Sequence, residues 1–148
     1  MDAANGSVDE SVMIALLPRS SEWCHIDLPH LTLVYGGLMK DLGPSAFNEL
    51  AKDAAMLAMI SSPVVLRVTG RKRFGPSMDT DVFTLQPTPE LLALRRAVES
   101  WNASDFAFNP HVTIGLPGTF VPDIPTYISF DRIMVGWGTE RLDFWLKR

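Results

Sequence analysis

Cysteine is almost absent from this chain of 148 residues, since Cys24 is the only one. A lone cysteine excludes an internal disulfide, so the fold does not depend on an oxidising compartment. The apolar run at residues 11–17 is about one strand long and far too short to cross a membrane. Residues 1–10 are acidic and small, unlike a signal peptide, and we expect them to be flexible. These features predict a cytoplasmic protein with no membrane contact.

Positive charge is also scarce. Thirteen Lys and Arg residues stand against seventeen Asp and Glu residues, which gives a formal net charge of −4. This balance argues against binding of long nucleic acids, which usually requires a basic surface. A small nucleotide or a short oligonucleotide, held by a few local groups, is compatible with it.

The composition is otherwise that of a folded globular protein, with 47% hydrophobic and 20% charged residues. The length suits one domain that spans residues 1–148. No linker or change of composition divides the chain. Nothing in the sequence indicates an oligomeric state.

Apolar periodicity and turn-forming residues divide the chain into nine elements. We expect strands at residues 11–17, 30–35, 64–70, 81–86, 111–116, 127–137 and 141–147, and helices at 44–60 and 89–101. The intervening residues 71–80 are basic and then turn-rich, which is typical of a connection. The order β-β-α-β-β-α-β-β-β lacks strict β-α alternation. It therefore predicts an α+β sandwich of two mostly antiparallel sheets with two outer helices.

One short phrase occurs twice, in LPHLTLVYGG at residues 28–37 and in NPHVTIGLPG at residues 109–118. Each copy reads Pro-His-apolar-Thr-apolar and runs into glycine, and two of the three histidines of the chain lie in it. Side chains at positions i and i+2 of a strand point to the same face. His30 therefore shares a face with Thr32, and His111 with Thr113, while the apolar neighbours anchor each strand in the core.

Two imidazoles and two hydroxyls in one cleft suit phosphodiester chemistry. One neutral imidazole can accept a proton from an attacking hydroxyl, and a protonated one can donate to the leaving oxygen. Threonine hydroxyls can donate to the phosphate oxygens, where charge accumulates in the transition state. This chemistry requires no metal and no cofactor.

Two other interpretations compete with this one. A single His-x-Thr in a strand is more often structural than functional, but two matching copies in a chain with three histidines argue against chance. A zinc site needs at least one further ligand, and no H-x-x-x-H or C-x-x-C spacing supplies it. We therefore expect no metal site.

The duplicated phrase, its separation and the order of strands and helices resemble the 2H phosphoesterase superfamily over nearly the whole chain. That superfamily includes 2′-5′ RNA ligase-like proteins, cyclic phosphodiesterases and phage enzymes that degrade cyclic-nucleotide defence signals. The resemblance implies a bilobal α+β sandwich with a central cleft, and catalytic roles for His30, Thr32, His111 and Thr113. The compact size is most similar to short phage-encoded members, which would place the protein in the host cytoplasm.

The chain departs from the family at one position. Many members read H-x-T-x-x-R at the second phrase, where this chain has Leu116. Any phosphate contact of that arginine must then come from elsewhere or be absent, and the basic triplet at residues 71–73 is the obvious substitute. Such a triplet is also typical of a solvated strand edge. Of the three residues in this triplet, we expect Arg73 to lie in the substrate-binding site.

Two aromatic residues complete the predicted substrate-binding set. Phe74 precedes a turn-rich loop that can cover the cleft, and an aromatic ring there can stack on a base. Trp137 is flanked by Gly136 and Gly138, which is typical of exposure at a turn. Packing in the core is an equal alternative for both rings. His25 lies outside the repeated phrase, and we expect it on a surface loop.

The sequence thus predicts a metal-independent phosphodiesterase acting on a cyclic oligonucleotide signal, a 2′,3′-cyclic phosphate or a 2′-5′ linkage. A phage counter-defence enzyme is one form of this prediction. The alternative is a non-catalytic binder that sequesters cyclic nucleotides or RNA ends in the same cleft. A purely structural protein that keeps only the family fold ranks last.

Overall fold

The structure is a computed structural model, and it describes residues 11–148 except residues 22, 25, 27, 76 and 122. The expectations for residues 1–10 and for His25 lie outside the described residues. None of the described helices is long and apolar enough to span a bilayer.

The described residues form seven strands, three α-helices and one 3-10 turn. The strands are β1 (Ser11–Pro18), β2 (Leu31–Leu38), β3 (Val64–Phe74), β4 (Thr80–Leu85), β5 (His111–Gly115), β6 (Tyr127–Trp137) and β7 (Glu140–Trp145). The helices are α1 (Met39–Leu42), α2 (Ala46–Ile60) and α3 (Pro89–Ala97), and the 3-10 turn is Glu99–Trp101. The predicted order of strands and long helices is confirmed.

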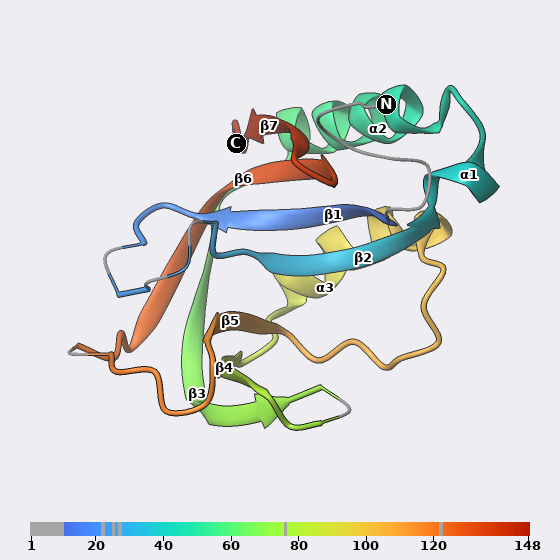
Figure 1. Ribbon diagram of the computed structural model, residues 1–148. Coiled ribbons are helices and arrows are strands. Elements are labelled where there is room, and N and C mark those ends of the chain that lie inside the picture. Colours follow the sequence, from blue (N-terminus) through green and yellow to red (C-terminus); the bar gives the residue numbers. More distant parts are fainter. Residues whose placement is uncertain (1–10, 22, 25, 27, 76, 122) are drawn as a thin grey trace.

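The strands pair in the order β2-β1-β6-β3-β4-β5, and every pairing is antiparallel. Strand β7 pairs with residues 132–137 of β6, beyond the part of β6 that pairs with β3. Strand β3 belongs to both halves of this arrangement. Residues 64–67 pair with β6, and residues 68–74 pair with β4. The two halves therefore lie one above the other, joined along β3 (Figure 1). The predicted α+β architecture of antiparallel sheets is confirmed.

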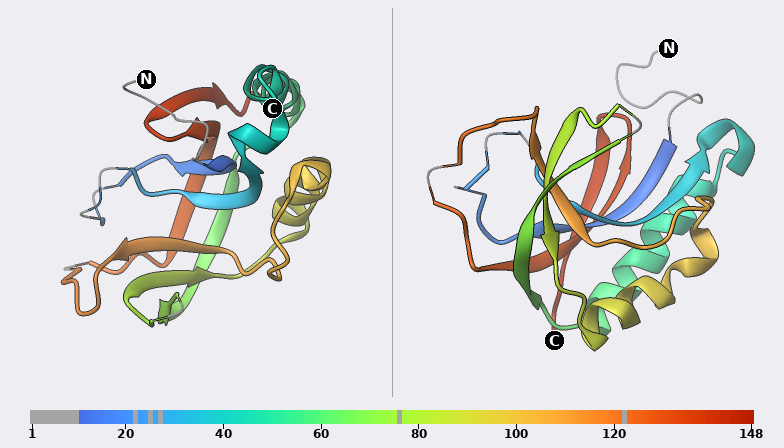
Figure 2. Two further views of the ribbon diagram at one scale, coloured as in Figure 1. Left: turned by 45° about the vertical axis from the view of Figure 1, so that its right-hand side comes forward. Right: turned by 90° about the horizontal axis from the view of Figure 1, so that it is seen from below.

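Both long helices lie on the same side of the strands, as two views of the ribbon show (Figure 2). Their buried faces include Leu50 and Ala54 of α2 and Leu91 of α3, which join one hydrophobic cluster with Phe83 and Phe130 from the strands. Thr88 begins α3 as predicted, because its hydroxyl accepts a hydrogen bond from the Leu91 N–H at 3.2 Å.

Strand alternation gives the sheet a second face, away from the helices. Val12, Ile14 and Leu16 of β1 point into the main core, while Ala15 and Leu17 form a separate small cluster. This second face is the one on which the repeated phrase places its polar side chains.

Several boundaries differ from the sequence-based expectation, and the short helix α1 was not expected; two of the differences matter for the site and its packing. The basic triplet at residues 71–73 belongs to β3 and not to a connection, because its backbone continues to pair with β4 as far as Phe74 and Thr80. The second long helix ends at Ala97, and a 3-10 turn carries Trp101 onto the core instead. The Trp101 indole N–H donates to Asp53 of α2 at 2.8 Å, which ties this turn to the other helix.

Candidate active site

The first copy of the phrase lies at the start of β2. His30 directly precedes the strand, and Thr32 pairs with Ala15 of β1 on the face away from the helices. Leu31 and Leu33 point to the opposite face and are buried in the core. The predicted division of this strand into a polar face and an apolar face is confirmed.

The second copy forms β5 itself. His111 pairs with Thr84 and Thr113 with Val82, both on β4, while Val112 is buried in the core. Both histidines and both threonines are half-buried. The two strands come from different halves of the molecule, so the phrase is presented once from each side.

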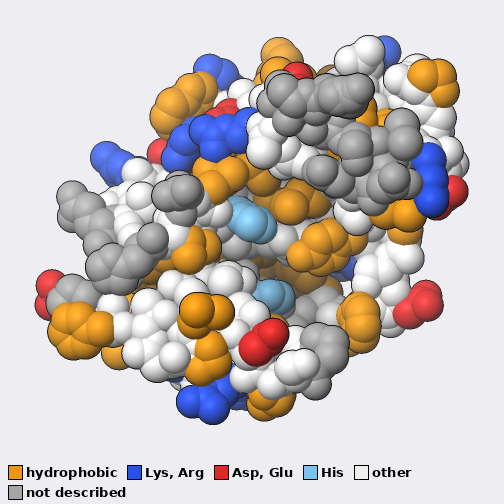
Figure 3. Space-filling model, viewed as in Figure 1, with side chains coloured by type: hydrophobic (Ala, Val, Ile, Leu, Met, Phe, Trp, Pro, Cys, Tyr) orange, Lys and Arg blue, Asp and Glu red, His pale blue; other side chains and the backbone are white. Residues whose placement is uncertain are grey.

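Contacts across the two halves bring the copies together. Strand β2 contacts β5, and the Cys24 thiol, in the loop that leads to His30, lies 3.8 Å from the Thr113 carbonyl oxygen. In the space-filling view (Figure 3), the two described histidines lie on the same side of the molecule, in a hollow between its upper and lower parts. The described structure thus places both imidazoles at one groove.

The two imidazoles are held in the same way. Nδ1 of His30 lies 2.8 Å from the Leu28 carbonyl oxygen, and Nδ1 of His111 lies 2.7 Å from the Asn109 carbonyl oxygen. A carbonyl oxygen can only accept, so Nδ1 carries the hydrogen in each ring. This bond fixes the tautomer and leaves Nε2 as the nitrogen that can exchange a proton with a ligand.

The threonine hydroxyls add two donors beside these rings. Among the described residues, neither the Thr32 nor the Thr113 hydroxyl has a hydrogen-bond partner. Each hydroxyl lies two residues along the chain from its histidine, roughly 6.6 Å in a strand. Both are therefore available to a bound group at the groove.

Phe74 lies at the groove beside the second copy. Its ring centroid is 4.6 Å from that of His111, with the ring planes at 61° in an edge-to-face arrangement. Register places Phe74 on the same face as Thr80, Thr84 and His111. Of the three predicted substrate-binding residues, this one is brought against a histidine.

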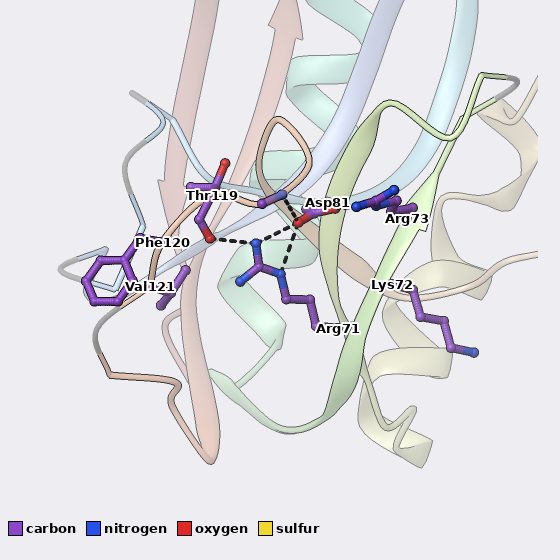
Figure 4. A pocket seen from close by; sticks show the side chains of 8 residues that line it. Arg71, Lys72, Arg73, Asp81, Thr119, Phe120 and Val121 are labelled. Carbon is purple, nitrogen blue, oxygen red and sulfur yellow. Dashed lines mark hydrogen bonds and ion pairs between the residues drawn. The ribbon is translucent and has the colours of Figure 1, made fainter.

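Arg73 points to the other side of the same strand. It shares that face with Arg71, and both guanidinium groups reach Asp81, a carboxylate only 4% exposed (Figure 4). Arg71 donates to Asp81 Oδ2 from Nη2 at 2.6 Å and from Nε at 3.1 Å. Arg73 Nε lies 3.6 Å from Oδ1.

The same ion-pair cluster fastens the loop that follows β5. The Gly118 N–H donates to Asp81 Oδ2 at 2.9 Å, and Arg71 donates to the Thr119 carbonyl at 2.5 Å. With Lys72 and Phe120, these groups line a pocket of about 510 Å³. Arg71 therefore stabilises the loop after β5. The sequence analysis missed Asp81. No local motif marks it, because its partners are brought together only by the pairing of β3, β4 and β5.

These contacts make the stability of the fold sensitive to acid. The Arg71 hydrogen bond, with help from the Gly118 N–H and the charge of Arg73, holds the pKa of Asp81 below its ordinary value, although burial opposes the shift. An unfolded Asp takes up its proton near pH 4, at a higher pH than the folded one. The stabilisation is therefore present above about pH 4 and is lost as the pH falls through the lower folded pKa.

We expect the difference in melting temperature between the wild type and Asp81→Asn to shrink as the pH falls from about 6 to about 3. Thermal melts of both proteins across this range measure it. A difference that stays constant over the range would contradict the role given to the Asp81 charge.

The second phrase ends in Gly115, and the structure gives a steric reason for glycine at this position. Gly115 has φ +144°, and a Cβ atom on it would lie 2.6 Å from Thr119 Oγ1. Any larger residue would displace the loop that Asp81 and Arg71 hold. Leu116, which stands where many relatives have arginine, is 76% exposed at the start of that loop.

Trp137, the third predicted substrate-binding residue, packs toward α2. Its ring is half-buried, with the centroid 5.9 Å from that of Phe47. The alternation of β6 instead directs Gly136 to the groove face. A pocket of about 480 Å³ there is lined by His30, Met13, Gly136 and Arg141, among others. The sequence analysis missed Arg141, since only the pairing of β7 with β6 brings it near the first phrase.

Within the described part of the chain, no group of three or more His, Cys, Asp or Glu residues could hold a metal ion. The polar groups that gather at the groove are instead imidazoles and hydroxyls. They offer proton donors and acceptors to a ligand.

Comparisons with known proteins bear on the family and the fold of this chain. Residues 25–120 match the sequence model of the 2′-5′ RNA ligase superfamily. A Geobacillus kaustophilus protein named as a phosphoesterase is 26% identical over 110 residues, which are 71% of this chain and 62% of that protein. A second relative, from Geobacillus thermodenitrificans, matches equally well. The chain thus spans less than two thirds of the length of these curated relatives.

Solved structures show the same fold. TT0787 of Thermus thermophilus has a TM-score of 0.64 at 14% identity, covering 93% of this chain and 98% of that one. LigT of E. coli, solved with 3′-AMP, has a TM-score of 0.57 at 16% identity, covering 94% and 96% of the two chains. The match to the family covers both copies of the repeated phrase. The chain therefore belongs to the 2′-5′ RNA ligase superfamily, within the 2H phosphoesterases that the phrase predicted.

Proposed function

We propose that this protein is a metal-independent phosphodiesterase that cleaves a small nucleotide by acid–base catalysis between His30 and His111. The observation that carries the proposal is that the two imidazole rings are held in the same tautomer by equivalent hydrogen bonds. Each uses Nδ1 on the carbonyl oxygen two residues before it, so both present Nε2 as the exchangeable position.

The reaction needs one ring neutral and the other protonated. The neutral Nε2 accepts the proton of the attacking water or ribose 2′-hydroxyl as the new O–P bond forms. The protonated Nε2 donates its hydrogen to the leaving oxygen as the old P–O bond breaks. Thr32 and Thr113 donate to the non-bridging oxygens, where negative charge grows. The near symmetry of the site lets the rings exchange roles in the reverse direction.

The relatives support an activity on phosphoesters. The Geobacillus relatives carry phosphoesterase names, and LigT structures contain 3′-AMP, phosphate, ATP or NADP+. Candidate substrates here are a cyclic oligonucleotide signal, a 2′,3′-cyclic phosphate and a 2′-5′ linkage. Cleavage of a cyclic signal in the cytoplasm of a host cell would make the protein a phage counter-defence enzyme.

Mass spectrometry of products from a panel of these three substrate classes tests the proposal. We expect turnover of at least one class, and the same rate after dialysis against EDTA, because the proton carriers belong to the chain. A rate that EDTA abolishes and a divalent cation restores would contradict the metal-independent mechanism.

The same panel separates catalysis from sequestration. A protein that only binds would return the ligand unchanged after heat release at every pH tested. Recovery of intact ligand from all three classes would therefore contradict the phosphodiesterase and favour a protein that only sequesters nucleotides.

A further inference from the structure

The pocket beside His30 has an apolar floor. Met134 belongs to the small buried cluster on the groove face, against which Met13 and Leu28 also pack. All three line the pocket. Methionine is an adaptable apolar side chain whose sulfur makes favourable contacts with flat aromatic rings. This floor suits a nucleobase better than it suits a phosphate.

Small residues leave the space above that floor open. Register aligns Thr32, Ala15 and Met134 in one row across β2, β1 and β6. The next row contains Met13, Gly136 and Arg141, across β1, β6 and β7. Gly136 has no side chain, and a Cβ atom there would make ordinary contacts with Met134 and Met13 at 3.5 and 3.6 Å. A larger side chain at this position would enter the pocket.

Arg141 supplies a positive charge at the far edge of the pocket. Its side chain is 43% exposed, and its Nη2 lies 3.5 Å from Asp143 Oδ2, two residues along the same face. Glu140 also lines the pocket; it pairs with Trp137, and its backbone carbonyl oxygen would lie 4.0 Å from a Cβ atom on Gly136. In Figure 3, basic side chains gather over the β6–β7 hairpin near one of the histidines.

Distance separates this charge from the threonine of the first phrase. Strand β7 lies three strands away from β2, which is roughly 14 Å at the usual spacing. An arginine side chain does not span that gap. Thr32 and Arg141 therefore stand at opposite ends of the pocket, and Met13 of β1 and Met134 of β6 lie between them.

We infer that this pocket binds one nucleoside with a phosphate at each end. Its base rests on Met13 and Met134, one phosphate lies at the histidines, and the second is held by Arg141. This inference rests on the proposed function and narrows it, because it favours substrates with two neighbouring phosphates, such as linear or cyclic oligonucleotides. A 2′,3′-cyclic mononucleotide leaves Arg141 unused.

Binding of adenosine 3′,5′-bisphosphate, 3′-AMP and 5′-AMP by isothermal titration calorimetry tests the inference. None of these probes contains a phosphodiester, so the proposed reaction does not act on them and the readout is binding alone. We expect the bisphosphate to bind at least about tenfold more tightly than the better monophosphate, the scale of one charge-assisted hydrogen-bonded contact. Arg141→Gln is expected to remove this advantage, and Arg67→Gln, at an exposed position of β3, to keep it.

A second variant tests the base. Gly136→Val fills the pocket and is expected to weaken all three probes, while its melting curve reports that it folds. Equal binding of bisphosphate and monophosphate by the wild type, or an undiminished advantage in Arg141→Gln, would overturn the inference. Neither result bears on catalysis, which the turnover of histidine variants tests separately. Conversely, tight binding of the bisphosphate without turnover of any diester would support the nucleoside pocket and contradict the proposed phosphodiesterase activity.

Discussion

Replacement of His111 by alanine is expected to lower the turnover number by about 10²- to 10⁴-fold, the usual effect of one positioned proton transfer. His30→Ala is expected to fall in the same range, because its ring is held by an equivalent bond. The residual rate of the double variant should lie close to that of the slower single variant, since groups that act as a unit are not additive. Single-turnover kinetics on the best substrate of the panel measure all three.

The melting temperature of each variant is the control, because it reports whether the fold is intact. Both rings are half-buried at the groove, so each alanine variant should melt close to the wild type although its rate falls. The wild-type pH–rate profile should be bell-shaped, because one ring must be neutral and the other protonated. Full activity of either single variant would falsify the two-histidine mechanism.

Asp81→Ala is expected to lower the melting temperature by several degrees, which is a large effect for a single substitution in a domain of this length. The change leaves two arginines facing each other without their carboxylate, and it removes the acceptor of the Gly118 N–H. Asp81→Asn keeps an oxygen for that N–H but no charge, and should fall between the wild type and the alanine variant.

Asp105→Ala is the matched control, since Asp105 is exposed on a loop. It should melt close to the wild type in differential scanning calorimetry. If Asp81→Ala and Asp105→Ala melt at the same temperature, the ion-pair cluster does not secure the loop after β5.

The sequence predicted those parts of the fold and site that depend on local patterns. Strand alternation placed Thr32 and Thr113 on the groove face, and Thr88 marked the start of a helix. The repeated phrase identified both histidines, and the structure brings them to one groove. Their part in catalysis stays a prediction.

The sequence did not predict what depends on strand order. Asp81 and Arg71 meet because β4 pairs with β3, and Gly136 and Arg141 meet because β7 pairs with β6. The triplet at residues 71–73 resembled a loop because its charges hide the strand pattern. The alternation of β3 then separates neighbours, since Arg73 turns to Asp81 while Phe74 turns to His111.

The continuity of β3 through both halves has a consequence for how this fold can diversify. One strand carries the pairing of β6 and then that of β4, with an irregularity between Val68 and Gly70 where the second pairing begins. Because β2 belongs to the half that contains β6 and β5 to the half that contains β4, a change in the bend of β3 would change the distance between the two rings. Substitutions along β3 could therefore adjust the span of phosphodiester that fits, while the residues that perform the chemistry stay unchanged.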